Sequence, residues 1–177
     1  LIAAGSDDQQ VYLFQKSSNI PLWSHMTGDW VGSVALSQDG RYLAAGSDDG
    51  QVLLFHKDNS TPLWSYQTGS YVRSVAISGS SDHIVAGSWD RMVYLFTKES
   101  SAPVWSYATG DFVYDVDISA NGEFLTAGSN DRKVYLFQQS DPTPLREYTT
   151  GRKVQAVAIS ASGQFIIAGS HDDHIYM

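Results

Sequence analysis

The chain has 177 residues and a formal net charge of −8, which disfavours a general nucleic-acid-binding surface because non-specific affinity for phosphates comes from clustered Lys and Arg. It contains no cysteine, which excludes disulfides and thiolate metal sites. No apolar run approaches the roughly 20 residues of a membrane-spanning helix, so we expect no membrane span in this segment.

One stretch recurs at a fixed interval along the whole chain. It reads A-A-G-S-D-D-G-Q-V-L-L-F at Ala44–Phe55. Its serine is found again every 41 residues, at Ser6, Ser47, Ser88, Ser129 and Ser170. Self-similarity at such a period indicates an array of small, similar structural units.

The chain opens in residues 1–28 with the end of a unit, and the first whole unit covers residues 29–69. We predict four short strands in this unit, a to d in chain order: Val31–Ser37, Arg41–Ser47, Gln51–Phe55 and Pro62–Tyr66. Turn-forming Asp and Gly residues separate a from b and b from c. Strands b and c are almost continuously apolar, which predicts neighbours on both of their faces. Such a sheet buries both faces only by stacking on copies of itself.

The later units repeat this pattern over residues 70–110 and 111–151, and residues 152–177 form a partial unit. The later a strands are expected at Val72–Ser78, Val113–Ser119 and Val154–Ser160, and the later d strands at Pro103–Tyr107 and Pro144–Tyr148. No linker or composition shift interrupts the chain, so we expect a single domain over residues 1–177.

The predicted fold is therefore an all-β β-propeller with four-stranded antiparallel blades and a 41-residue repeat. The first blade lacks strand a and the last lacks strand d, which favours an arc of a larger ring of about six to eight blades. Further blades of the same propeller, or another copy, would then complete the ring. The alternative is a compact four-blade ring in which Val154–Ser160 completes the first blade.

The first half of the repeat reads V-x-S-V-A-I/L-S-x-D-G-x-x-L-A-A-G-S-x-D-x-x-V-x-L-F. This pattern resembles the WD-repeat family in strands a to c. Two features depart from that family, because no Gly-His dipeptide precedes strand a and phenylalanine replaces the tryptophan that ends strand c. The phenylalanines at this position are Phe14, Phe55, Phe96 and Phe137. The resemblance implies that part of the family's hydrogen-bond network is present, carried by the Ser-x-Asp pairs.

The second half of the repeat, P-L-W-S-Y-x-T-G, is similar to repeats of quinoprotein-like (pyrroloquinoline-quinone-type) propellers. Trp23, Trp64 and Trp105 would be their packing tryptophans on strand d, and Arg146 departs from the pattern. This resemblance implies an alternative function as a redox enzyme, whose quinone and calcium ion need converging carboxylate, amide and cationic residues. No such set is evident in repeats this similar, so we predict no cofactor and no enzymatic activity.

Two polar patterns have a structural interpretation that we prefer to a catalytic or metal-binding one. The Ser-x-Asp pairs occur in every blade, whereas a site is normally built once, so we interpret them as turn-stabilising residues. These pairs include Ser47 and Asp49, Ser88 and Asp90, and Ser129 and Asp131. The cluster His171-Asp172-Asp173-His174 has metal-ligand types, but its histidines align with variable positions and favour a solvated loop.

The repeats differ most in their b–c turns and d–a connections, which must emerge on the same face of the molecule. We call this the variable face. Its d–a connections are Asp29-Trp30, Ser70-Tyr71, Asp111-Phe112 and Arg152-Lys153, and its b–c turns begin at Asp7, Asp48, Trp89, Asn130 and His171. The face changes from acidic in the early units to basic in the later ones.

Aromatic and arginine side chains are enriched at protein-binding hot spots. We therefore predict a non-catalytic scaffold that binds a protein, or a glycan, through this face. The predicted contact residues are Trp30, Tyr71, Trp89, Arg91, Phe112 and Arg132. Free drift of turn sequences explains the same variability without any function. A structural module of a cell-surface or multi-subunit assembly is a further alternative.

Overall fold

The computed structural model describes all 177 residues, which form eighteen strands in five antiparallel sheets without any helix. Accordingly, no helix in the structure has the length and apolarity that crossing a membrane would require. The predicted all-β fold with four-stranded antiparallel sheets is confirmed.

The three central sheets each contain four strands in the order a-b-c-d. They are β4 (Val31–Leu36), β5 (Tyr42–Ser47), β6 (Gln51–His56) and β7 (Trp64–Gln67); β8 (Val72–Ile77), β9 (His83–Ser88), β10 (Met92–Thr97) and β11 (Ser100–Ala108); and β12 (Val113–Ile118), β13 (Phe124–Ser129), β14 (Lys133–Gln138) and β15 (Asp141–Thr149). The two end sheets have three strands each. They are β1 (Ile2–Gly5), β2 (Gln10–Phe14) and β3 (Pro21–Met26), and β16 (Val154–Ile159), β17 (Ile166–Ser170) and β18 (Ile175–Tyr176).

The d strands are the least accurately predicted elements. The structure extends the strand expected at Pro103–Tyr107 to the whole of β11, and the strand expected at Pro144–Tyr148 to β15. The reason is a register shift in strand c, after which Thr97 pairs with Ser100 and Gln138 pairs with Asp141. The c–d connection is thus a tight hairpin, whose polar sequence resembles a loop.

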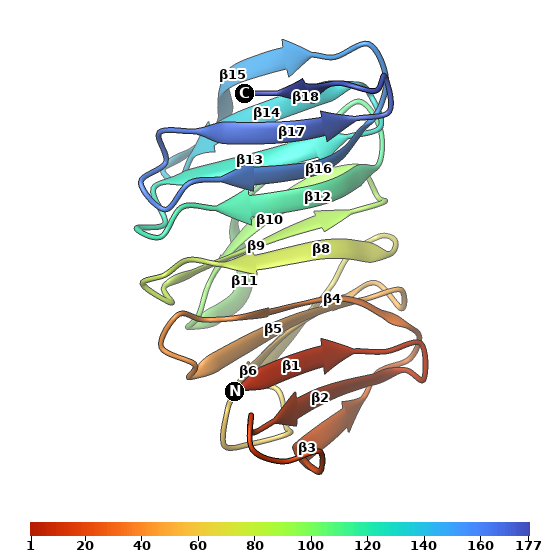
Figure 1. Ribbon diagram of the computed structural model, residues 1–177, viewed down its shortest axis with the longest axis vertical. Coiled ribbons are helices and arrows are strands. Elements are labelled where there is room, and N and C mark those ends of the chain that lie inside the picture. The colour runs from red at the N-terminus through yellow and green to blue at the C-terminus, as the bar shows by residue number, and fades with distance from the viewer.

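The sheets stack into an open arc, with the two chain termini near opposite ends of the stack (Figure 1). The four-blade ring is wrong, because β16 pairs with β17 in the last sheet while β1 pairs only with β2 in the first. The physical reason is local. A short hairpin brings β16 to β17 at a small cost in loop-closure entropy, whereas pairing β16 with β1 would close the whole chain.

The hydrophobic cores lie between consecutive sheets. Strands b and c are buried on both faces, as their apolar sequences predict, with Leu43, Leu54 and Phe55 fully inaccessible in β5 and β6. The largest cluster joins the β8–β11 and β12–β15 sheets and includes Leu95 and Phe137. Each sheet therefore covers the face that its neighbour cannot bury alone.

The tryptophans of strand d hold each sheet to the next one. Each ring packs on the phenylalanine at the end of the next strand c, with centroids 5.3 to 5.5 Å apart. Each indole N–H also donates to a backbone carbonyl of the next sheet: Trp23 to Lys57 at 2.8 Å, Trp64 to Lys98 at 3.0 Å and Trp105 to Gln139 at 2.8 Å. Phenylalanine thus fits the end of strand c because a tryptophan of the preceding sheet covers it.

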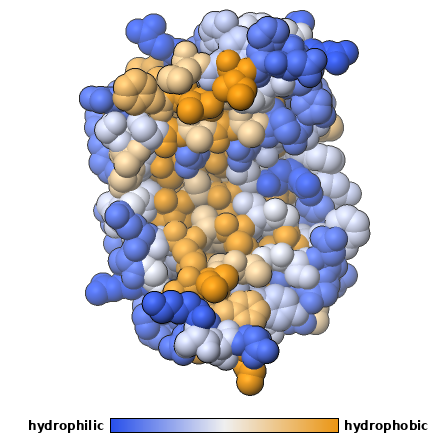
Figure 2. All heavy atoms as spheres, viewed as in Figure 1, coloured by the Kyte–Doolittle hydropathy of each residue, from blue (hydrophilic) through white to orange (hydrophobic).

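The b–c turns and d–a connections lie along one edge of the arc, at the right in Figure 1. Backbone hydrogen bonds join the two kinds of segment within each sheet, for example from Trp89 N to Tyr71 O at 2.9 Å and from Asn130 N to Phe112 O at 2.8 Å. Hydrophilic residues gather along this edge and the opposite one, whereas apolar residues follow the middle of the molecule (Figure 2).

Candidate functional site

The turn aspartates of the last four Ser-x-Asp pairs bind donors from two neighbouring blades. Asp90 accepts hydrogen bonds from Met92 N at 2.9 Å, from the Tyr94 hydroxyl at 2.6 Å and from Gly69 N at 2.8 Å. Gly69 belongs to the preceding unit, so this last bond crosses from one blade to the next. The Ser88 hydroxyl oxygen accepts a hydrogen bond from Asp90 N at 3.1 Å and orders the turn further.

The same arrangement recurs in the other units. The bond that crosses between blades runs from Gly28 to Asp49, from Gly110 to Asp131 and from Gly151 to Asp172, at 2.6 to 2.7 Å. Tyr12, Tyr135 and Tyr176 donate to their own aspartates as Tyr94 does, whereas Leu53 takes that place in the second unit. These carboxylates are committed to backbone and tyrosine donors.

The hydrogen bonds shift the pKa values of the partners. Burial first, and then the hydrogen bond to Asp90, raises the pKa of Tyr94 far above its ordinary value. For Asp172, desolvation acts to raise the pKa, but hydrogen bonds from Tyr176, Gly151 and Ser170 outweigh it and lower the pKa strongly. Asp172 therefore stays ionised and the tyrosines stay protonated at neutral pH, which preserves the donor and acceptor roles.

The sequence contained a signal for the bonds between blades that the analysis of single units missed. It is the Thr-Gly dipeptide at the end of each unit, whose glycine N–H reaches the next aspartate. The threonine hydroxyl is also fixed: that of Thr109 lies 2.9 Å from the Arg91 carbonyl oxygen and 2.6 Å from the Asp111 carbonyl oxygen. It thereby joins a b–c turn to a d–a connection on the variable face.

A second cross-link that the sequence did not reveal lies on the inner strands. Asp115 and Asp117 of β12 accept hydrogen bonds from the backbone of β16, at Val157 N and Ile159 N, over 2.9 and 2.8 Å. Burial raises the pKa of Asp117, and the neighbouring Asp115 raises it further, against two backbone hydrogen bonds that lower it. These carboxylates join neighbouring a strands side by side.

Three of the predicted contact residues form one aromatic cluster on the variable face. The Trp89 ring stacks on Phe112 with centroids 5.2 Å apart and an interplanar angle of 14°, and the Tyr71 ring centroid lies 5.4 Å from that of Trp89. Tyr71 is 42% exposed, while Trp89 and Phe112 are half-buried. The indole N–H of Trp89 is inaccessible and has no hydrogen-bond partner.

Two residues of the a strands complete this cluster and were missed by the sequence analysis. Tyr114 meets Trp89 edge-on at 6.0 Å, and the Arg73 guanidinium carbon lies 5.3 Å from the Trp89 ring centroid. Both occupy the second position of strand a, where the other units have Gly32 and Gln155. Variation at that position was the signal that could have identified them. We call Tyr71, Arg73, Trp89, Phe112 and Tyr114 the aromatic cluster.

The other predicted contact residues lie outside the aromatic cluster. Trp30 is 52% exposed on the same face, but no aromatic side chain packs on it. Arg91 and Arg132 are exposed at the tips of their b–c turns, both with φ of 75°. This left-handed conformation is favoured at glycine, which occupies the same place as Gly50 in the second unit.

A polar hollow of about 370 Å³ lies next to the cluster, between the last two sheets on the variable face. It is lined by Asn130, Arg132, Arg152, Lys153 and His171. We call it the basic hollow. Its backbone is held in place, because Thr150 bridges the carbonyls of Arg132 and Arg152 and His171 N donates to Lys153 O at 3.0 Å.

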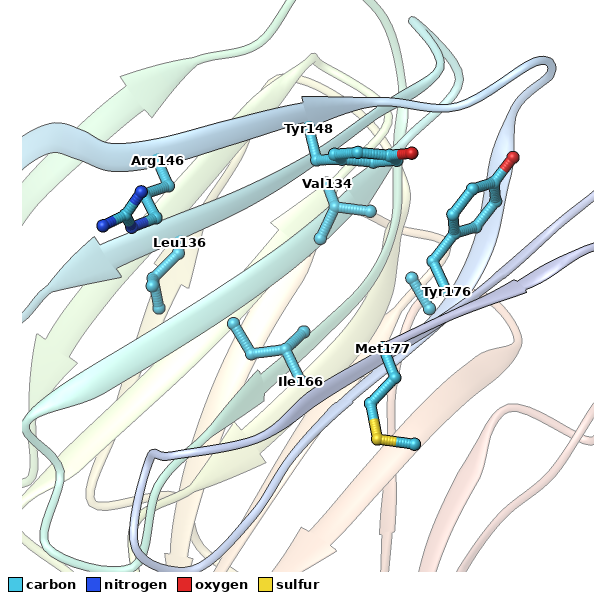
Figure 3. A pocket seen from close by; sticks show the side chains of 8 residues that line it. Val134, Leu136, Arg146, Tyr148, Ile166, Tyr176 and Met177 are labelled. Atoms are coloured by element: carbon cyan, nitrogen blue, oxygen red, sulfur yellow. The ribbon is translucent and has the colours of Figure 1, made fainter.

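An apolar hollow of about 290 Å³ lies between β14 and β15 on one side and β17 and β18 on the other (Figure 3). It is lined by Val134, Leu136, Arg146, Tyr148, Ile166, Ala168, Tyr176 and Met177. The positions 41 residues earlier form the closed core that contains Trp105 and Phe137. The hollow is therefore a blade interface in which Arg146 replaces tryptophan.

The histidine cluster near the C-terminus does not converge on one point. His171 Nε2 lies 3.2 Å from Gln155 Oε1, and His174 Nδ1 lies 2.7 Å from the Asp172 carbonyl oxygen. The Asp172 carboxylate is already bonded to Gly151 and Tyr176. The structure brings no three His, Asp or Glu side chains into an arrangement for a metal ion.

Comparison with protein families finds four consecutive matches to one repeat model, described as WD domain, G-beta repeat, at residues 19–56, 60–97, 102–138 and 142–177. The first three matches run from around strand d of one sheet to strand c of the next, so each straddles a blade interface. A search of curated proteins gives no match to this chain.

Proposed function

Because the chain belongs to the WD-repeat family, whose propellers commonly serve as protein-interaction scaffolds, we propose that it is a non-catalytic scaffold that binds a protein through its variable face. Repeats of this family are generally non-enzymatic, and function must then be argued from the surface that varies between repeats. That surface is the edge formed by the b–c turns and d–a connections (Figure 1).

The observation that carries the proposal is the aromatic cluster. It assembles aromatic side chains from the third and fourth sheets and the connections that lead into them, with a guanidinium over the largest ring. Clustered aromatic and arginine residues supply large contact areas at little cost in side-chain entropy, which is why they dominate binding hot spots. The Thr-Gly and Ser-x-Asp hydrogen bonds fix the backbone below the cluster, so little ordering is needed on binding.

The same contacts argue for a scaffold over the alternative redox enzyme. Trp23, Trp64 and Trp105 are used between blades, and the turn aspartates are bonded to backbone amides. The regular polar residues of the repeat are thus occupied in holding blades together.

Selection of peptides from a random display library on the immobilised chain tests the proposal. We expect selected peptides to bind Tyr71→Ala and Phe112→Ala at least tenfold more weakly, since hot-spot aromatics contribute about 2 kcal/mol or more. Isothermal titration calorimetry measures the affinities, after circular dichroism has shown unchanged folding of each variant.

Phe165→Ala is the matched control, because Phe165 is an aromatic residue with 61% exposure at the opposite end of strand b. The control should bind the selected peptides as the wild type does. Peptides that bind both cluster variants with unchanged affinity would contradict the proposed face.

A further inference from the structure

We propose that the basic hollow binds an anionic side chain of the partner, a carboxylate or a phosphate group, within an acidic peptide that also contacts the aromatic cluster. This inference rests on the proposed function and adds the chemical class of the ligand. Three observations support it. The cations of the hollow have no acidic partners, the face has a hollow large enough for a side chain, and this hollow adjoins the aromatic cluster.

The cations of the hollow differ from most others in the chain because they have no acidic partner. Five of the eleven Lys and Arg side chains form ion pairs with carboxylates: Arg41, Lys57, Arg73, Lys98 and Lys133. No ion pair includes Arg132, Arg152 or Lys153. Three uncompensated cations around one hollow, in a chain of net charge −8, form a local site for an anion.

Asp111, whose carboxylate contacts the rim of the hollow, forms no ion pair with these cations. Asp111 accepts a hydrogen bond from the Asn130 amide at 2.6 Å and another from Phe112 N at 2.8 Å. The donors that remain are the two guanidinium groups and the Lys153 ammonium. Guanidinium groups bind carboxylate and phosphate oxygens in a bidentate manner, so this set suits either anion.

The hollow and the aromatic cluster are continuous. Lys153 Nζ lies 4.8 Å from the centroid of the Tyr114 ring, which in turn meets Trp89 edge-on. Asn130 N, from the rim of the hollow, donates to the carbonyl of Phe112 in the cluster at 2.8 Å. A peptide of a few residues can therefore place an apolar side chain on the cluster and an acidic one in the hollow.

Charge on the rest of the face favours a peptide over a nucleic acid. The early units present Asp7 in a b–c turn and Asp29 in a d–a connection of the same face, where a phosphate backbone would be repelled. Nucleic-acid binding needs an extended track of cations, whereas this site offers only three. A short acidic segment needs no more than that.

Fluorescence anisotropy of a labelled peptide with two leucines followed by four glutamates tests the inference. A peptide with glutamines in place of the glutamates removes the charge, one with two phosphoserines supplies phosphate, and a single-stranded DNA 12-mer supplies a polyanion. We expect the glutamate or phosphoserine peptide to bind at least tenfold more tightly than the glutamine peptide, with affinity that falls as salt is added. The tighter of these two identifies the anion.

Arg152→Gln and Lys153→Gln should each weaken binding of the acidic peptide about tenfold and leave the glutamine peptide unaffected. Lys16→Gln is the matched control, since it removes an equally unpaired, exposed cation in a c–d loop at the opposite edge. It should change affinity by less than twofold.

Three outcomes would overturn the inference: equal affinity for the glutamate, phosphoserine and glutamine peptides, equal effects of the hollow variants and Lys16→Gln, or tighter binding of DNA than of either acidic peptide. None of these removes the effect of Tyr71→Ala on the display-selected peptides. Failure of the anion site is thus separate from failure of the variable face as a binding surface.

Discussion

The Tyr94 hydroxyl shows how a single group contributes to a turn that joins two blades. It is nearly inaccessible and donates a hydrogen bond of 2.6 Å to Asp90 Oδ2, the same oxygen that accepts the bond from Gly69 of the preceding unit. Removing the hydroxyl leaves a carboxylate oxygen with one donor fewer in a partly buried place. The loss is therefore larger than that of an exposed hydrogen bond.

Tyr94→Phe should lower the free energy of unfolding by about 1–2 kcal/mol, measured by urea denaturation. Tyr66→Phe is the matched control, because the Tyr66 ring packs on Phe96 while its hydroxyl has no hydrogen-bond partner in the structure. The control should lose less than about 0.5 kcal/mol. Equal losses in the two variants would show that the bond to Asp90 adds nothing to stability.

At the scale of the strand, the repeated Ala-Gly-Ser of strand b is explained by close approach to the next sheet. A Cβ atom on Gly87 of β9 would lie 2.6 Å from Cγ1 of Val113 and 3.0 Å from Cγ1 of Val116. Gly46 and Gly128 face Val72 and Val154 in the same way. Because valine is β-branched and has little rotamer freedom, the sheets must move apart to admit a larger residue.

Gly87→Ala should accordingly lower the free energy of unfolding by about 1–3 kcal/mol, the cost of overpacking a core. In the polypeptide of residues 1–177, Gly169→Ala is a matched control in the equivalent place of β17, where no atom lies within 4 Å of the added Cβ. That change should be neutral or slightly stabilising, since alanine suits a strand interior better than glycine. Thermal and urea unfolding of both variants measure the difference, and a loss in Gly169→Ala as large as in Gly87→Ala would refute the packing argument.

The strands could be predicted from the sequence because each depends on local information. The apolar b and c strands, bounded by turn residues such as Asp39-Gly40, fall within one residue of β5 and β6. The aromatic cluster was only partly predictable. Tyr71, Trp89 and Phe112 vary at turn positions, but Arg73 and Tyr114 lie within strand a, and only packing between sheets brings them to Trp89.

The basic hollow was less predictable still. Arg132 and His171 come from the b–c turns of two sheets and Arg152 from the d–a connection between these sheets, and whether the cations have acidic partners depends on side-chain placement. The sequence showed a face that becomes basic toward its later units, but not that three of its cations remain unpaired around one hollow. Spacing along a chain carries no information about such pairing.

At the scale of the whole molecule, the arc is a row of sheets in which each sheet contacts only its neighbours. Stability in such an array is close to a sum of repeat and interface contributions, so in the polypeptide of residues 1–177 the two end sheets should open first. The burial values follow this order. Val85 in β9 is fully inaccessible, whereas Ile167 at the equivalent place in β17 is 44% exposed.

Native-state hydrogen exchange of the polypeptide of residues 1–177 tests this order of stability. Because β18 pairs with only two residues of β17, the comparison uses the amides that face strand a, which lie in similar antiparallel ladders in β9 and β17. We expect amides of β9 and β13 to exchange only through global unfolding and those of β17 to exchange at least tenfold faster, through local opening of the last interface. Arg146 replaces the tryptophan that closes the other interfaces. The apolar hollow beside it reduces the packed contact area that is lost when the last sheet opens. Equal protection of β17 and β9 would show that the arc unfolds as one cooperative unit despite its open ends.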